Sequence, residues 1–120
     1  MRRAPPLKEP GMLNLPTEIF GDTIVVHAPD ELAEEQADEF VAYVTALERA
    51  NVIVDLDATE SLDSKGLEAI MESREVLHDL AGDLKIATTS KVNRKILEIT
   101  RLDRQVEIFE SVIDAVKSFA

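Results

Sequence analysis

The sequence predicts a single α/β domain with a small, mixed and mostly parallel sheet of about four or five strands and about four helices. Two observations lead to this fold class. Short apolar segments that resemble strands alternate with segments whose apolar residues recur at helical spacing. The chain has 120 residues, 45% of them hydrophobic, which suits one ordinary domain with a buried core. Strands that alternate with helices need crossover connections, and these make neighbouring strands parallel.

The first half of the chain predicts a hairpin, a helix and a buried strand. Residues 13–20 and 23–28 have strand character on either side of Gly21 and Asp22, a pair of residues typical of tight turns. Pro29 ends the second strand, and helical periodicity extends from residue 30 to residue 49. Residues 52–56 are almost wholly apolar, which is typical of a strand covered on both faces.

The second half predicts three more helices and two more strands, with the helices packed mainly on one face of the sheet. A helix begins at Asp63 or Ser64 and stops at Gly82, and residues 84–87 form the next strand. A third helix covers residues 91–99, a short strand covers 105–109, and a last helix follows Ser111. The inward face of the third helix is expected to carry Val92, Ile96 and Ile99.

Composition excludes several classes of function. The chain has no cysteine, so disulfides, thiolate metal sites and cysteine catalysis are ruled out. A net charge of −11 and only five aromatic residues argue against nucleic-acid binding. No apolar stretch is long enough for a signal peptide or a membrane span, so we expect a cytoplasmic protein. Residues 1–12, which include three prolines, are expected to be a disordered leader or an expression remnant, and residues 13–120 the domain.

The segment LDSKGL, residues 62–67, is the best candidate for a functional site. It opens a helix, where backbone N–H groups lack partners within the helix. Asp63 or Ser64 in this position can act simply as the N-cap. Ser64 can instead be a regulatory phosphoserine, because the helix dipole and the free N–H groups favour a phosphate there.

Three segments together resemble one known family. VIVDL at 52–56, followed by LDSKGL at 62–67, resembles the signature of the STAS domain, found in bacterial anti-sigma-factor antagonists. ILEITRLD at 96–103 and IFESVIDAV at 108–116 are similar to later parts of the same family. The resemblance covers about residues 15–119.

The resemblance implies a protein-interaction module with no enzyme activity and no cofactor or metal of its own. Its partner would be a serine kinase that also acts as an anti-sigma factor, and a serine phosphatase would reverse the modification. Ser64 matches the phosphorylated position. The expected partner-binding residues are Asp57, Asp63, Ser64, Lys65, Gly66 and Leu67, with Gly66 admitting a partner backbone. We expect a monomer or weak dimer.

The sequence departs from the family pattern at several positions. Lys65 replaces a small hydroxyl residue, Arg101 stands where glycine is common, and Glu60 and Ser61 replace more apolar residues. Residues 28–32 lack the Gly-Glu-Leu-Asp turn of the family. A constitutive scaffold or subunit of a stress-signalling or lipid-transport complex is therefore the alternative function.

Other candidate sites have weaker patterns. Asp55, Asp57 and Asp63 could suggest a receiver domain or a metal site, but the acidic pair and lysine that a receiver needs are missing. His27 is expected to be a half-exposed strand residue rather than a base. Basic residues are concentrated at 85–104, either as a solvated helix face or as a basic lip beside the acidic loop. They are Lys85, Lys91, Arg94, Lys95, Arg101 and Arg104.

Overall fold

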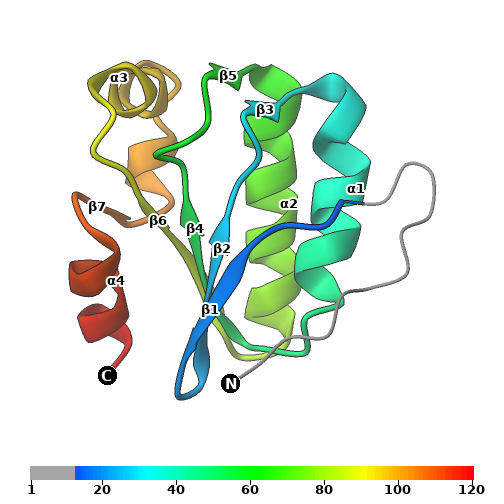
Figure 1. The fold of residues 1–120 in the computed structure, drawn as a ribbon, viewed down its shortest axis with the longest axis vertical. Helices are drawn as coiled ribbons and strands as arrows, with labels where there is room; N and C mark the ends of the chain where they lie inside the picture. Colours follow the sequence, from blue (N-terminus) through cyan, green and yellow to red (C-terminus); the bar gives the residue numbers. More distant parts are fainter. Residues whose placement is uncertain (1–12) are drawn as a thin grey trace.

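A computed structural model of the protein describes residues 13–120, and the expected leader, residues 1–12, lies outside this range. Its main sheet has five strands in the order β1-β2-β4-β6-β7, and four helices surround it (Figure 1). The predicted fold class is therefore confirmed. The strands are β1 Thr17–Phe20, β2 Thr23–His27, β3 Glu31–Leu32, β4 Asn51–Asp55, β5 Ser61–Leu62, β6 Asp83–Ala87 and β7 Ile108–Phe109. The helices are α1 Glu34–Thr45, α2 Ser64–Asp79, α3 Lys91–Ile99, the 3₁₀ turn η1 Leu102–Arg104, and α4 Val112–Phe119.

The main sheet is parallel except at one edge. β1 pairs with β2 in antiparallel fashion, whereas β2, β4, β6 and β7 are parallel neighbours. The hairpin between β1 and β2 turns at Gly21, whose φ of +63° is a left-handed conformation that glycine adopts without steric cost. The carboxyl ends of β2, β4 and β6 consequently lie at the same edge of the sheet, next to the loops that lead into the helices.

Helices cover both faces of the sheet, which corrects the expectation that they lie mainly on one. α1 and α2 lie side by side on one face, and α4 lies on the other (Figure 1). Successive side chains of a strand point to opposite faces. Val52 and Val54 therefore join the larger core, while Val25 and Ile53 pack against Ala115 of α4.

A second, two-stranded sheet displaces the start of the first helix. β3 pairs in parallel with β5, so Glu31 and Leu32 are extended rather than helical. α1 consequently begins at Glu34 instead of residue 30, and it ends at Thr45 rather than residue 49. Helical periodicity does begin at Ala33, but the pairing of β3 with β5, thirty residues later in the chain, determines where the helix starts.

The C-terminal elements also differ in detail from the prediction. Val92 and Ile99 are 68% and 70% exposed, so the prediction that they face inward is wrong, whereas Ile96 is partly buried and packs against the main core as expected. Asn93 and Leu97 are the buried residues of α3. The helix is turned so that Asn93 reaches the Leu56 carbonyl in the loop after β4. The strand expected at 105–109 is limited to Ile108–Phe109 because η1 precedes it, and β1 covers only the second half of 13–20.

Candidate functional site at the start of helix α2

The loop after β4 and the loop after β6 are neighbours, as the parallel arrangement predicts. Asp57 Oδ1 accepts hydrogen bonds from the Thr89 backbone N–H at 2.6 Å and from the Thr89 hydroxyl at 3.1 Å. Asp55 Oδ1 accepts a hydrogen bond from the Asp57 backbone N–H at 3.0 Å. The acidic loop is therefore tied to the segment that leads into α3.

Asn93 holds the same loop from inside the protein. Its buried side-chain amide donates to the carbonyl oxygens of Leu56 and Thr59, at 3.1 and 2.8 Å. Thr59 is also buried, and its hydroxyl donates to the Pro29 carbonyl at 2.8 Å. Sequence reasoning missed Asn93, because a polar residue inside an amphipathic helix gives no signal of a partner that lies 37 positions earlier in the chain.

Asp63 is the N-cap of α2, and its carboxylate serves two helices. Oδ1 accepts from the Gly66 backbone N–H at 2.9 Å, as an N-cap should. Oδ2 accepts from the backbone N–H of Glu34, the first residue of α1, at 3.2 Å. The N-termini of α1 and α2 are thus joined through one side chain, although Asp63 itself is exposed.

Ser64 is the first residue of α2 and is exposed. Among residues 13–120, no partner forms a hydrogen bond with its hydroxyl or with the backbone N–H groups of Ser64 and Lys65. Those two N–H groups lie at the positive end of the helix dipole. The hydroxyl is therefore available to an incoming group, and no neighbouring base is hydrogen-bonded to it to activate it as a nucleophile.

The residues that follow Ser64 divide into exposed and buried positions. Lys65 is exposed, and its Nζ lies 3.7 Å from Glu68 Oε1. Gly66 and Leu67 are buried. A Cβ on Gly66 would lie 2.0 Å from the Leu32 carbonyl oxygen, so the backbone that approaches Gly66 closely is this chain's own β3 rather than the expected partner backbone.

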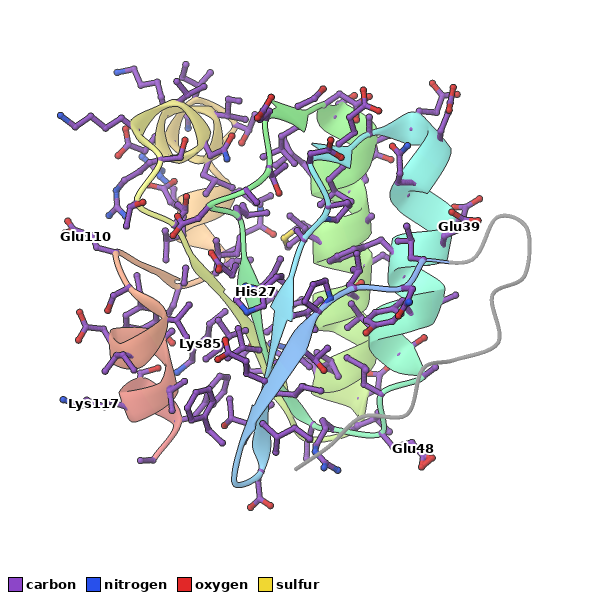
Figure 2. All side chains as sticks on the ribbon, viewed as in Figure 1. His27, Glu39, Glu48, Lys85, Glu110 and Lys117 are labelled. Atoms are coloured by element: carbon purple, nitrogen blue, oxygen red, sulfur yellow. The ribbon has the colours of Figure 1, made fainter. Side chains whose placement is uncertain are left out.

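His27 lies between two carboxylates and is more engaged than the sequence predicts. Its Nδ1 is 2.8 Å from Asp55 Oδ2, and its Nε2 is 2.8 Å from Glu18 Oε1. Figure 2 shows His27 at the sheet. Partial burial lowers the pKa of His27, but the hydrogen bonds and negative charges of Glu18 and Asp55 outweigh it and raise the pKa above 6.5. The pairing of β2 with β4 places His27 beside Asp55. Aligning the two predicted strands in this register would have revealed the contact from the sequence.

Lys85 does not belong to a basic lip. It is buried on the face of the sheet that α4 covers, where Figure 2 labels it. Its Nζ donates to the Ser118 hydroxyl at 2.8 Å, lies 3.3 Å from Glu107 Oε1, and sits 4.1 Å from the centre of the Phe119 ring. Lys85 therefore holds α4 against the sheet, and only the more C-terminal basic residues of 85–104 remain on the surface.

Two further features of the described residues bear on function. Residues 13–120 contain no group of three or more His, Asp or Glu side chains placed to hold a metal ion. Within the same range, no helix combines the length and apolar character needed to cross a membrane. What the site does provide is an exposed hydroxyl and two free N–H groups on a rigidly anchored helix start.

The fold and the site together define an α/β domain with an exposed serine at the start of a helix. The sequence of residues 14–115 matches the family model of the STAS domain. The chain belongs to the STAS domain family, which confirms the resemblance seen in the sequence. No curated protein sequence is significantly similar to this chain.

Solved structures support the same fold. A candidate anti-sigma-factor antagonist from Thermotoga maritima has a TM-score of 0.78 and 24% identity, covering 87% of this chain and 92% of its own. An anti-sigma-factor antagonist from Mycobacterium paratuberculosis has a TM-score of 0.77 and 22% identity, covering 93% and 97%. The Bacillus cell fate determinant SpoIIAA, solved in its phosphorylated form, has a TM-score of 0.67 and 16% identity, covering 89% and 100%. At these identities the similarity establishes the fold.

Proposed function

We propose that this protein is a phosphorylation-controlled binding module: an anti-sigma-factor antagonist that binds a serine kinase acting as anti-sigma factor. The kinase phosphorylates Ser64, and a serine phosphatase reverses the step. The single observation that supports this most is the exposed, unpartnered Ser64 hydroxyl at the start of α2. Membership of the STAS family and the likeness to anti-sigma-factor antagonists add support. In this proposal the protein is not an enzyme and acts in the cytoplasm.

The proposed modification changes charge with little need for refolding. The Ser64 oxygen attacks the terminal phosphorus of the kinase's ATP, a kinase base takes the hydroxyl proton, and ADP leaves. The phosphate adds about −1.5 to −2 charges at neutral pH. The free N–H groups of Ser64 and Lys65 favour this anion, whereas the Asp63 carboxylate beside it disfavours it.

The proposed contact surface follows from which residues are exposed. Asp57, Asp63, Ser64 and Lys65 are exposed to solvent. Asp57 is held by its bond to Thr89, and Asp63 by its bonds to Gly66 and Glu34. Gly66 and Leu67 support this surface from beneath. Because the framework is anchored, a partner would read the added charge rather than a new backbone conformation.

The test is to incubate the protein with ATP and each serine kinase encoded in its genome, followed by intact mass and site mapping. One added phosphate is expected, and Ser64→Ala should abolish it. Ser61→Ala is the matched control, since Ser61 is also exposed and lies three residues away in β5. Ser64→Asp should weaken binding to the kinase that modifies the protein.

A different result would favour the alternative function. If no kinase adds phosphate, or if a bound kinase does not distinguish Ser64→Asp from the unmodified protein, the switch is wrong. The protein would then be a constitutive STAS scaffold or subunit of a stress-signalling or lipid-transport complex, with Asp63 and Ser64 serving only as a helix start.

A further inference from the structure

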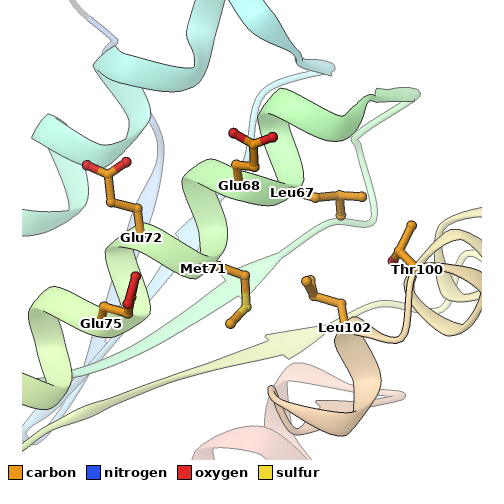
Figure 3. Close-up of a pocket in the computed structure, with 7 residues that line it drawn as sticks. All are labelled: Leu67, Glu68, Met71, Glu72, Glu75, Thr100 and Leu102. Carbon is orange, nitrogen blue, oxygen red and sulfur yellow. The ribbon is translucent and has the colours of Figure 1, made fainter.

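A groove runs between α2 and the turn that follows α3. It has a volume of about 510 Å³ and is open to solvent (Figure 3). Leu67 and Met71 from α2 and Leu102 from η1 form its apolar part. Leu67 and Leu102 are nearly buried, but Met71 is only partly covered. A flexible methionine in such a position can adjust to the side chains of a partner.

One wall of the groove is strongly acidic. Glu68, Glu72 and Glu75 line it at i, i+4 and i+7 on α2, so they form a row along the helix. The carboxylates of Glu68 and Glu72 lie on the side of α2 away from Leu102, at the outer rim of the groove (Figure 3). Lys65 partly offsets Glu68. Over the described part of the chain, neither Glu72 nor Glu75 forms an ion pair. Like charges at this spacing destabilise an isolated helix, and a cationic partner would relieve that repulsion.

The opposite wall offers no free side-chain hydrogen-bond donor for a small ligand. Thr100 lines this wall, but its hydroxyl donates to the Ile96 carbonyl at 2.7 Å within α3. Ile99, the residue before it, is 70% exposed. Within residues 13–120, the glutamates on α2 are the only charged residues that line the groove. A metabolite usually needs a concave pocket that buries most of its surface, so a groove this open to solvent suits a protein segment better.

We infer that this groove binds a cationic amphipathic helix of a partner protein, with lysine or arginine facing the glutamate row and apolar side chains entering between Met71 and Leu102. Glu68 to Glu75 spans about 10 Å along α2. Three cations at the same positions of a partner helix would span the same length. Three cations on one face of an extended strand recur every ~6.6 Å and would span about 13 Å. The inference goes beyond the Ser64 switch and does not depend on phosphorylation.

The charge of the protein separates this partner from other occupants. With a net charge of −11, a second copy, a nucleic acid or an anionic membrane would be repelled. A cationic helix is attracted by the whole molecule and is positioned by the glutamate row.

The groove can be tested with a synthetic helix-forming peptide of leucine and lysine, added to the full chain at ~0.15 M ionic strength. The chain has three methionines, Met1, Met12 and Met71, and Met71 lines the groove, so methyl labelling of methionine places a reporter there. Met71→Leu assigns that signal. We expect the peptide to shift the Met71 methyl signal, whereas peptides with Glu for Lys, or Ser for Leu, should not.

Paired charge variants separate local recognition from overall attraction. Glu72→Gln with Glu75→Gln should weaken peptide binding roughly tenfold. Glu35→Gln with Asp38→Asn removes the same charge from the exposed face of α1 and should change the affinity less than about twofold. Ser64→Ala should bind the peptide normally, so failure of the kinase switch and failure of this inference give different results.

Three outcomes would overturn the inference. The first is peptide binding that leaves the Met71 signal unchanged. The second is an equal loss of affinity in both charge variants, which would mean that net charge alone attracts the peptide. The third is a Met71 shift that depends on protein concentration without peptide, which would identify a second copy of the chain as the occupant.

Discussion

The double capping by Asp63 makes a quantitative prediction about stability. Asp63→Ala removes the acceptor for the Gly66 N–H at 2.9 Å and for the Glu34 N–H at 3.2 Å. Loss of an N-cap costs about 1 kcal/mol. The second bond adds about 0.5–1 kcal/mol, at the lower end of the usual range because water can reach the exposed Glu34 N–H. The expected loss is therefore about 1.5–2 kcal/mol, or roughly 6–8 °C in Tm for a chain of this size.

Urea denaturation followed by circular dichroism measures this loss, and the chain supplies matched controls. Ser90→Ala removes a cap with one bond, to Asn93, and should cost about 1 kcal/mol. Ser64→Ala removes no hydrogen bond and should change stability by less than about 0.5 kcal/mol. Asp63→Asn keeps one carbonyl acceptor and should fall between Asp63→Ala and the wild type. The reasoning is refuted if Asp63→Ala costs no more than Ser90→Ala.

Three further predictions follow from particular positions. Gly66→Ala forces a methyl group against the Leu32 carbonyl and should cost about 1–3 kcal/mol in urea denaturation, although an isolated helix would favour alanine. His27 has a raised pKa, so its contacts with Glu18 and Asp55 stabilise the fold fully below pH 6.5 and less as the pH rises. The free energy of unfolding of His27→Gln, measured against pH, should lack this decline. Parallel pH curves for the variant and the wild type would contradict these contacts. Arg101 has a φ of +63°, so Arg101→Gly should raise stability by up to about 1 kcal/mol in thermal unfolding, and a loss would show that the arginine side chain matters more than its backbone.

The sequence predicts which segment forms the candidate site, but not which residues contact one another there. The local pattern around Asp63 and Ser64 indicates a helix start, because capping depends on residues three positions apart. The second bond from Glu34 to Asp63 joins residues 29 positions apart and left no local signal. The same applies to Asn93, whose partners belong to another loop.

Residue type was a poor guide to exposure where tertiary contacts compensate for polarity. Lys85 sits in a basic stretch, yet its position on β6 directs it to the face that α4 covers. Ser118, Glu107 and the Phe119 ring then surround its ammonium group. Conversely, Val92 is exposed, because the side of α3 that faces the protein is the one that carries Asn93 and Leu97.

The sequence by itself determined the order of the main elements, the Gly21 hairpin and the helix start at Asp63. These follow from periodicity, turn chemistry and capping, which act over a few neighbouring residues. Only the tertiary structure decided where α1 begins, since Glu31 and Leu32 pair with β5 instead of joining the helix. It also decided that Gly66 accommodates Leu32, because contacts between segments distant in sequence depend on how the elements pack.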